Sequence, residues 1–132
     1  MSPARLKILY KDFRSAFKRL NAALAEDTKK GDIVIDGTIQ RFEFTFELSW
    51  KLMKGVLAQN GIQAGTPRDA IKESYQAGMI KDGKSWLKML ENRNQTSHIY
   101  NKSKARQIYR KIKNDYKKLF SSLEKNIKEF ME

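Results

Sequence analysis

The apolar residues of this chain recur at spacings of three and four along most of its length, which is the period of an amphipathic α-helix. A first stripe begins after Ser2-Pro3, a hydroxyl cap followed by proline at the first helical position, and the helix is expected to end near Asp27. The stripe consists of Leu6, Leu9, Phe13, Phe17, Leu20 and Leu24. This pattern predicts one long helix with basic residues on its other faces.

The second predicted helix, from Ile33 to Asn60, is the most apolar segment. A short run within it alternates as a strand would: Phe42, Phe44, Phe46 and Leu48. Over the longer window, helical spacing persists: Ile39, Phe42, Phe46, Trp50, Met53 and Leu57. Gly61 is expected to end this helix. Because Phe44 and Leu48 make it apolar on more than one side, this helix is either deeply buried or packed against a second partner, which is a first indication of a homodimer.

The remainder of the chain predicts a short helix and two long ones. Thr66-Pro67-Arg68-Asp69 starts the short helix and Gly78 ends it, with four residues expected to face inward: Ala70, Ile71, Ser74 and Tyr75. Asp82 caps the next helix, and Asn101 or Ser103 caps the last. The last apolar stripe is Ile108, Ile112, Tyr116, Leu119, Leu123, Ile127 and Phe130. We therefore expect an all-α fold, an antiparallel up-and-down bundle of four long helices plus one short helix, in a single domain spanning residues 1–132.

Composition excludes several classes of protein. The chain has no cysteine and one histidine, so a disulfide, a thiolate zinc site and a multi-histidine metal site are all excluded. We expect no metal and no cofactor. The first residues lack the apolar core of a signal peptide, and no apolar run approaches the ~18 residues that span a bilayer. A cytoplasmic protein without membrane contact is expected.

The net charge of +12 suggests an anionic partner such as RNA, DNA, a nucleotide or an acidic protein. A lysine-rich solvated surface is the alternative interpretation. The segment from Asn101 to Glu132 contains ten basic and four acidic residues, so half of the net positive charge lies in the last helix.

The stretch from Met89 to Tyr100 holds the candidate chemistry, because it contains the only histidine. His98 can move protons near neutral pH, and the Arg93 guanidinium binds phosphate. Asn94 lies four residues before His98 and would share its face on a helix. These residue types suit metal-independent cleavage of RNA by its 2′-hydroxyl, and a two-fold dimer would supply a second histidine. The alternative is that His98 is a helix cap or another structural residue.

A polar track runs beside the aromatic stripe of the second helix. It comprises Gln40, Glu43 and Glu47, at spacings of three and four. One interpretation is an exposed strip of the surface. The other is that a carboxylate here faces the central stretch and orients Arg93 or a bound nucleotide.

Arg93-Asn94-Gln95-Thr96-Ser97-His98-Ile99-Tyr100 resembles the R-x-x-x-x-H-x-Y motif of HEPN-domain proteins. The segments 36–51, 66–71 and 86–91 are similar to the HEPN subgroup named nucleotidyltransferase substrate-binding proteins. The resemblance covers roughly Asp36 to Tyr109. It implies an antiparallel helical bundle that forms homodimers and works with a separately encoded minimal nucleotidyltransferase.

The resemblance also implies roles for single residues. Arg93 and His98 would be the catalytic pair of a metal-independent endoribonuclease, often a toxin, with Asn94 as the polar residue after the arginine. Tyr100 would be the motif tyrosine to which the partner adds AMP, which silences the toxin. The older name of the subgroup implies instead a non-catalytic subunit that binds substrate or nucleotide for its partner.

Three hypotheses therefore stand beside one another: the ribonuclease toxin, the substrate-binding subunit of a two-component nucleotidyltransferase, and a plain helical dimer that binds nucleic acid through its basic last helix. The chain lacks the Gly-Ser pair and the paired aspartates of a nucleotidyltransferase, so it is not expected to be the catalytic subunit of nucleotidyl transfer.

Overall fold

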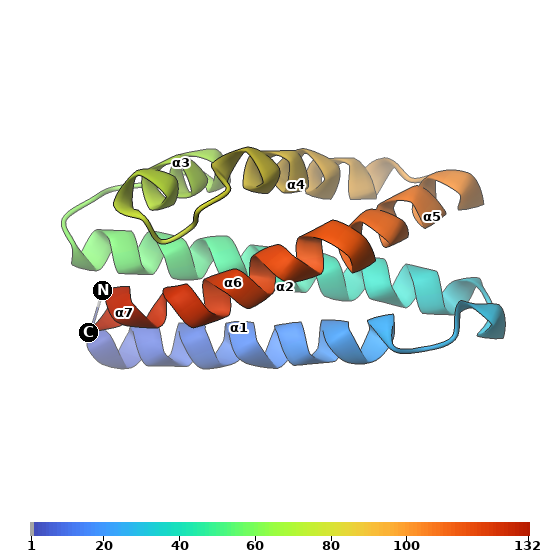
Figure 1. The fold of residues 1–132 in the computed structure, drawn as a ribbon, viewed down its shortest axis with the longest axis horizontal. Helices are drawn as coiled ribbons and strands as arrows, with labels where there is room; N and C mark the ends of the chain where they lie inside the picture. The colour runs from blue at the N-terminus through green and yellow to red at the C-terminus, as the bar shows by residue number, and fades with distance from the viewer. Residues whose placement is uncertain (1) are drawn as a thin grey trace.

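The structure, a computed structural model, describes residues 2–132 and is helical throughout (Figure 1). In chain order these residues form α1 (Pro3–Leu24), the 3-10 turn η1 (Thr28–Lys30), α2 (Asp32–Gln59), α3 (Pro67–Ala77), α4 (Gly83–Gln95), the 3-10 turn η2 (Thr96–His98), α5 (Lys102–Lys111), the π-helical turn η3 (Ile112–Tyr116), α6 (Lys117–Asn126) and α7 (Lys128–Met131).

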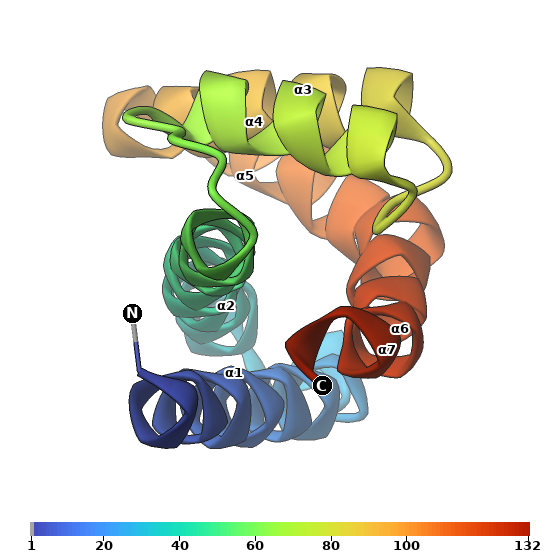
Figure 2. The ribbon, with the colours of Figure 1, turned by 90° about the vertical axis from the view of Figure 1, so that its left-hand side faces the viewer.

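The helices form a bundle around one shared core. α1 and α2 run antiparallel side by side, α3 and α4 cover another side of α2, and α5 to α7 form one nearly continuous rod that crosses back over α2 (Figures 1 and 2). The all-α bundle predicted from the sequence is confirmed, with α3 as the short helix. Within residues 2–132, no helix has both the length and the apolar character that crossing a bilayer requires.

The predicted helix starts are also present. The side chains of Ser2, Thr66 and Asp82 each accept a hydrogen bond from a backbone N–H in the first turn that follows. For the last helix the cap is Asn101, which accepts from the backbone N–H of Lys104 at 2.8 Å. Gly78 ends α3 in the left-handed conformation, with φ at 85°, which glycine adopts without strain.

The core is organised around the ring of Phe120 in α6. It lies 6.2 Å from Phe13 and 5.8 Å from Phe17, both in α1. It also lies 6.1 Å from Phe42 in α2 and 5.8 Å from Trp86 in α4. Edge-on and tilted contacts of this kind are favourable for aromatic pairs. One side chain therefore links the rod to each of the other three long helices.

Three details differ from the expectations. α1 ends at Leu24 rather than near Asp27, because Asp27 instead caps the turn η1. Tyr75 was expected to face inward, but its side chain is 54% exposed, so that prediction was wrong. The last helix is interrupted by η3, where the N–H of Lys117 bonds to the carbonyl of Ile112, five residues back.

The π-helical turn carries Tyr116, which is buried between two other helices. Its ring stacks on Phe42 of α2 at 5.8 Å and an interplanar angle of 18°. Its hydroxyl donates a hydrogen bond to the buried Asn92 Oδ1 of α4. Burial raises the pKa of Tyr116 to about 12, with smaller contributions from the negative charges of Asp115 and Glu91. The hydroxyl therefore remains a hydrogen-bond donor throughout the physiological pH range.

Two buried tyrosines of the rod provide a matched test of this hydrogen bond. Tyr116→Phe leaves Asn92 Oδ1 buried without its donor, so the free energy of unfolding should fall by about 1–3 kcal/mol. Tyr109 is also buried, but its hydroxyl has no hydrogen-bond partner among residues 2–132, so Tyr109→Phe should be neutral or stabilising. Urea unfolding of both variants measures the difference. Equal losses would show that the bond to Asn92 contributes nothing specific.

Candidate functional site

Three side chains from two distant segments meet near the middle of α2. Glu43 projects from α2 toward the end of α4, where its Oε2 lies 3.6 Å from Nη1 of Arg93. The same oxygen accepts a hydrogen bond of 2.8 Å from the hydroxyl of Thr96, whose Oγ also contacts the backbone carbonyl of Arg93 at 2.7 Å. Glu43 thus holds both the side chain of Arg93 and the first residue of the following turn.

The guanidinium of Arg93 is partly enclosed. Its side chain is 30% exposed and that of Glu43 is 31% exposed, so the ion pair is open to solvent on one side. A pair in this position contributes at most about 1 kcal/mol to stability. Nε of Arg93 is buried and has no hydrogen-bond partner among the described residues. The arginine is therefore held in one orientation at an energetic cost, while part of its fork of donors still faces outward.

His98 and Tyr100 lie just beyond, where the chain leaves α4. α4 ends at Gln95 and His98 belongs to the 3-10 turn η2, so Asn94 and His98 do not share one continuous α-helical face. His98 is exposed, and Tyr100 is 84% exposed. The connecting turn is held by a long hydrogen bond of 3.4 Å from Ser97 Oγ to the Asn94 carbonyl. An imidazole and a phenol are thus presented to solvent in the segment that directly follows α4.

The other members of the polar track lie elsewhere. Glu47 accepts a hydrogen bond of 3.1 Å from the Trp50 indole and lies 3.3 Å from Nζ of Lys51. Gln40 is exposed on α2. Of the three track residues, Glu43 is the one for which the described residues show a contact with the central stretch.

A surface hollow adjoins Tyr100 at the first turns of α2 and α5. Its volume is about 250 Å³, and its lining includes Ile35, Tyr100 and Arg106. Asp32 lies 3.0 Å from Lys102 Nζ and 3.6 Å from Arg106 at its rim. The hydrogen bond and the positive charge of Lys102 hold the pKa of Asp32 below its usual value. Sequence reasoning did not identify this hollow.

Sequence reasoning also missed Thr96, Asn92 and Tyr116. Thr96 belongs to the motif stretch, but its spacing gives no sign of a contact with α2. Asn92 lies three residues after the buried Met89, and a polar residue at an inward position signals a hydrogen-bond partner elsewhere in the core. Tyr116 was predicted within the apolar stripe, and its hydroxyl needs such a partner.

The arrangement suits the binding of a phosphate group. Arg93 supplies charge-assisted hydrogen bonds with a fixed geometry, and His98 supplies a group that can accept or donate a proton. Among residues 2–132, no three His, Cys, Asp or Glu side chains come together as a set of metal ligands.

Comparison with known proteins places the chain among its relatives. A family model described as "Nucleotidyltransferase substrate binding protein like" matches residues 9–129, nearly the whole sequence. The chain belongs to this family. A relative from Haemophilus influenzae named "Probable ribonuclease HepT" is 38% identical over 86 residues, which are 61% of this chain and 59% of the relative. The match therefore spans less than two thirds of that protein's length.

Two solved structures share the fold of this chain. A protein from Thermus thermophilus superimposes with a TM-score of 0.77 at 30% identity, covering 84% of this chain and 94% of the other. A Haemophilus influenzae protein, whose structure is described as the fold of a substrate binding domain of a nucleotidyltransferase, has a TM-score of 0.69 at 29% identity. That match covers 96% of this chain and 99% of the other. The resemblance noted in the sequence is confirmed.

Proposed function

We propose that this protein is a metal-independent endoribonuclease, of the toxin type, that acts in the cytoplasm together with a separately encoded minimal nucleotidyltransferase. The observation that carries the proposal is the guanidinium of Arg93, which Glu43 orients and which the exposed His98 and Tyr100 follow closely along the chain. The net charge of +12 favours an RNA substrate, and the relative named as a probable ribonuclease supports the activity.

The reaction follows from the chemistry of these groups. His98 takes the proton of an RNA 2′-hydroxyl, whose oxygen then forms a bond to the adjacent phosphorus while the bond from phosphorus to the 5′-oxygen breaks. Arg93 donates hydrogen bonds to the non-bridging oxygens as their negative charge grows. The leaving 5′-oxygen takes a proton from a second acid. The products are a 2′,3′-cyclic phosphate and a 5′-hydroxyl.

A homodimer would provide the second acid as the His98 of the other subunit. An outward stripe on α2 is suited to this contact: Ile33, Gly37, Gln40, Phe44 and Leu48. Ile33 is 79% exposed and Phe44 is 56% exposed, and a Cβ added at Gly37 would meet no atom within 4 Å. A two-fold axis that passes between Thr38 and Ile39 would pair Ile33 with Phe44 of the other copy and bring the Arg93 stretches to one seam.

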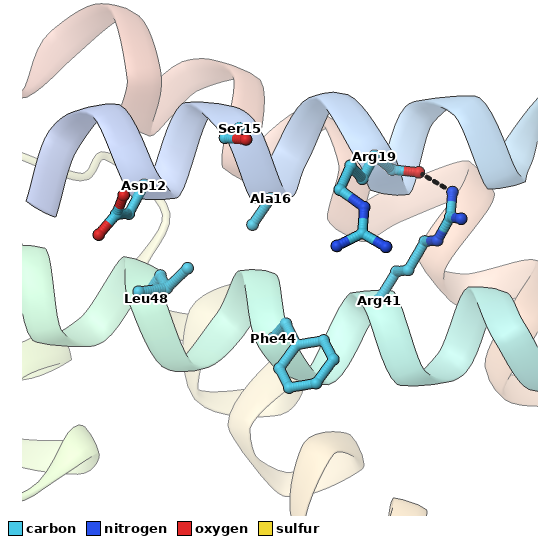
Figure 3. Close-up of a pocket in the computed structure, with 7 residues that line it drawn as sticks. All are labelled: Asp12, Ser15, Ala16, Arg19, Arg41, Phe44 and Leu48. Carbon is cyan, nitrogen blue, oxygen red and sulfur yellow. Dashed lines mark hydrogen bonds between the residues drawn. The ribbon is translucent and has the colours of Figure 1, made fainter.

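The surface next to Phe44 carries charges of both signs. A groove of about 350 Å³ separates α1 and α2, with Phe44 and Leu48 along it (Figure 3). Asp12 lies at one end, while Arg19 and Arg41 lie at the other, joined by a hydrogen bond from Arg41 to the Arg19 carbonyl at 2.8 Å. The apolar side chains of Phe44 and Leu48 thus lie between charges of opposite sign.

Tyr100 is the residue through which the partner enzyme would silence the nuclease. Its phenol is 84% exposed, so a nucleotidyltransferase can reach the oxygen without unfolding the site. Attack of this oxygen on the α-phosphorus of ATP forms a tyrosyl–AMP bond and releases pyrophosphate. The added phosphate and base would occupy the surface beside His98 and repel RNA.

The second candidate function is a non-catalytic subunit that binds substrate or nucleotide for the nucleotidyltransferase. It is favoured by the family description and by the solved relative described as a substrate binding domain. In this case Arg93 holds the phosphate of the substrate, and His98 has no role in bond cleavage.

Cleavage of RNA separates the two functions. The wild type should cleave RNA in the presence of EDTA and leave 2′,3′-cyclic phosphate ends, whereas His98→Ala should lose about 10²–10⁴-fold in rate. Gel analysis of 5′-labelled RNA measures the rate, and phosphatase resistance identifies the ends. Glu43→Gln should lower kcat with little change in the free energy of unfolding, because the ion pair is partly exposed. No cleavage by the wild type, or equal cleavage by the wild type and His98→Ala, would exclude the nuclease.

The homodimer can be tested with two exposed aromatic residues of similar accessibility. Phe44→Lys places a charge on the proposed interface and should shift the protein from dimer to monomer in light scattering coupled to gel filtration. Tyr75→Lys, on α3, should leave the mass unchanged, since Tyr75 is 54% exposed but lies away from that face. A dimer that survives Phe44→Lys would contradict the proposed interface.

The partner can be tested by co-expression of this chain with a minimal nucleotidyltransferase. The two should co-purify, and the mass of the chain should rise by one or more AMP groups. Tyr100→Phe removes the acceptor oxygen and should abolish the increase while leaving cleavage intact. Modification that persists in this variant would exclude Tyr100 as the acceptor, and failure to co-purify would contradict the partnership.

A further inference from the structure

We propose that the hollow between the first turns of α2 and α5 binds one base of the RNA, and that the carboxylate of Asp36 makes this base guanine. The inference rests on the proposed function, since it names the nucleotide that lies beside the phosphate held by Arg93. The experiment below distinguishes failure of the hollow from failure of the nuclease.

The size and lining of the hollow suit a single flat ring. Its volume of about 250 Å³ is slightly below the roughly 300–1,000 Å³ of ordinary ligand pockets, which leaves room for a base with its ribose outside. Ile35 and Ala105 are buried within the core and form an apolar floor, together with the half-buried Ile99. The exposed ring of Tyr100 and the guanidinium of Arg106 lie at the rim, and both groups stack on bases.

The charged groups of the hollow are not equivalent. Asp32 is engaged with both Lys102 and Arg106, so its charge is neutralised and these three residues together carry one net positive charge. Asp36 lies one helical turn after Asp32 on the same face of α2 and also lines the hollow. Its side chain forms no ion pair or hydrogen bond within residues 2–132, so its two oxygens are available as acceptors.

A free carboxylate in a base-sized hollow favours guanine. Guanine carries two adjacent N–H donors, N1–H and the 2-amino group, which match the two oxygens of one carboxylate. Adenine and cytosine each place a ring nitrogen acceptor next to the amino group, and this nitrogen would face the second oxygen. Uracil offers one donor between two acceptors. Two parallel charge-assisted hydrogen bonds are therefore available to guanine alone among the four bases.

The hollow lies at the right distance from Arg93. Asp36 and Glu43 are seven residues apart on one face of α2, which corresponds to roughly 10 Å along the helix axis. This is about the reach of one nucleotide from its phosphate to the far edge of its base. Ile99 and Tyr100, which follow His98 directly, line the hollow and connect it to the proposed site of cleavage.

The experiment uses the full-length protein and short RNAs that differ at one position. Non-cleavable 2′-O-methyl oligonucleotides share one uridine-poor sequence and differ at a single position, which holds guanine, adenine, cytosine or uracil. Their binding is measured by fluorescence anisotropy. DNA oligonucleotides with a single ribonucleotide, varied in its own base and in the base that follows, report cleavage. The wild type should prefer guanine about tenfold or more in both assays.

Base analogues and variants identify the contact. Inosine, which lacks the 2-amino group, should lose most of the preference, whereas 7-deazaguanine, with an intact Watson–Crick edge, should retain it. Asp36→Asn should reduce the preference to less than about threefold, because the amide has one acceptor oxygen and its NH2 group would face an N–H donor of guanine. Asp36 is exposed, so this variant is expected to fold normally. Asp115→Asn, at an exposed carboxylate that lines a different surface hollow, should leave the preference unchanged.

The possible outcomes separate the two proposals. Equal binding of the four bases by the wild type, or a guanine preference that survives Asp36→Asn, would overturn the assignment of the hollow. A guanine preference in binding without cleavage would leave the hollow assigned and exclude the nuclease. Cleavage without a base preference would leave the nuclease and remove the guanine site.

Discussion

The side chain of Tyr116 makes two contacts on which the geometry of the site depends. Its ring stacks on Phe42 of α2, and its hydroxyl donates to Asn92 of α4. Each contacted residue directly precedes one partner of the Glu43–Arg93 ion pair. The ion pair itself is half open to water and too weak to fix two helices. The buried tyrosine therefore sets the relative position of α2 and α4, and Glu43 and Arg93 meet because their neighbours are anchored in the core.

The π-helical turn explains how the rod provides this anchor. In a regular α-helix, each residue is rotated by a constant angle from the one before it. The hydrogen bond from Lys117 to the carbonyl of Ile112 widens one turn and changes the orientation of every side chain that follows. Tyr116 at the end of the turn reaches Asn92, while Phe120, one turn later, contacts rings of the other three long helices. A local irregularity thus aligns the polar anchor and the aromatic core in one element.

The sequence predicted the helices because apolar spacing and capping residues are local signals. Thr66 and Asp82 cap their helices as expected. The prediction failed where a side chain's environment depends on distant elements: Tyr75 fits the inward pattern of α3, yet it is 54% exposed, with its ring beside Gly83 at the start of α4. The π-helical turn was equally hidden, since the apolar stripe continues through it. The residues of the R-x-x-x-x-H-x-Y motif were identified in advance, and their proposed roles stay predictions.

The contact between Glu43 and Arg93 shows the limit of the sequence most clearly. A carboxylate facing the central stretch was one of two interpretations of the polar track, because periodicity gives the face of a helix but not what lies opposite. The structure also shows why α2 can carry a line of acids in a protein with a net charge of +12. Asp32 and Glu43 are each paired with a basic residue of another segment, so they add little repulsion toward a phosphate backbone. Asp36 has no such partner within residues 2–132. An unpaired carboxylate disfavours phosphates, and the part of a nucleotide that it can bind is the donor edge of a base.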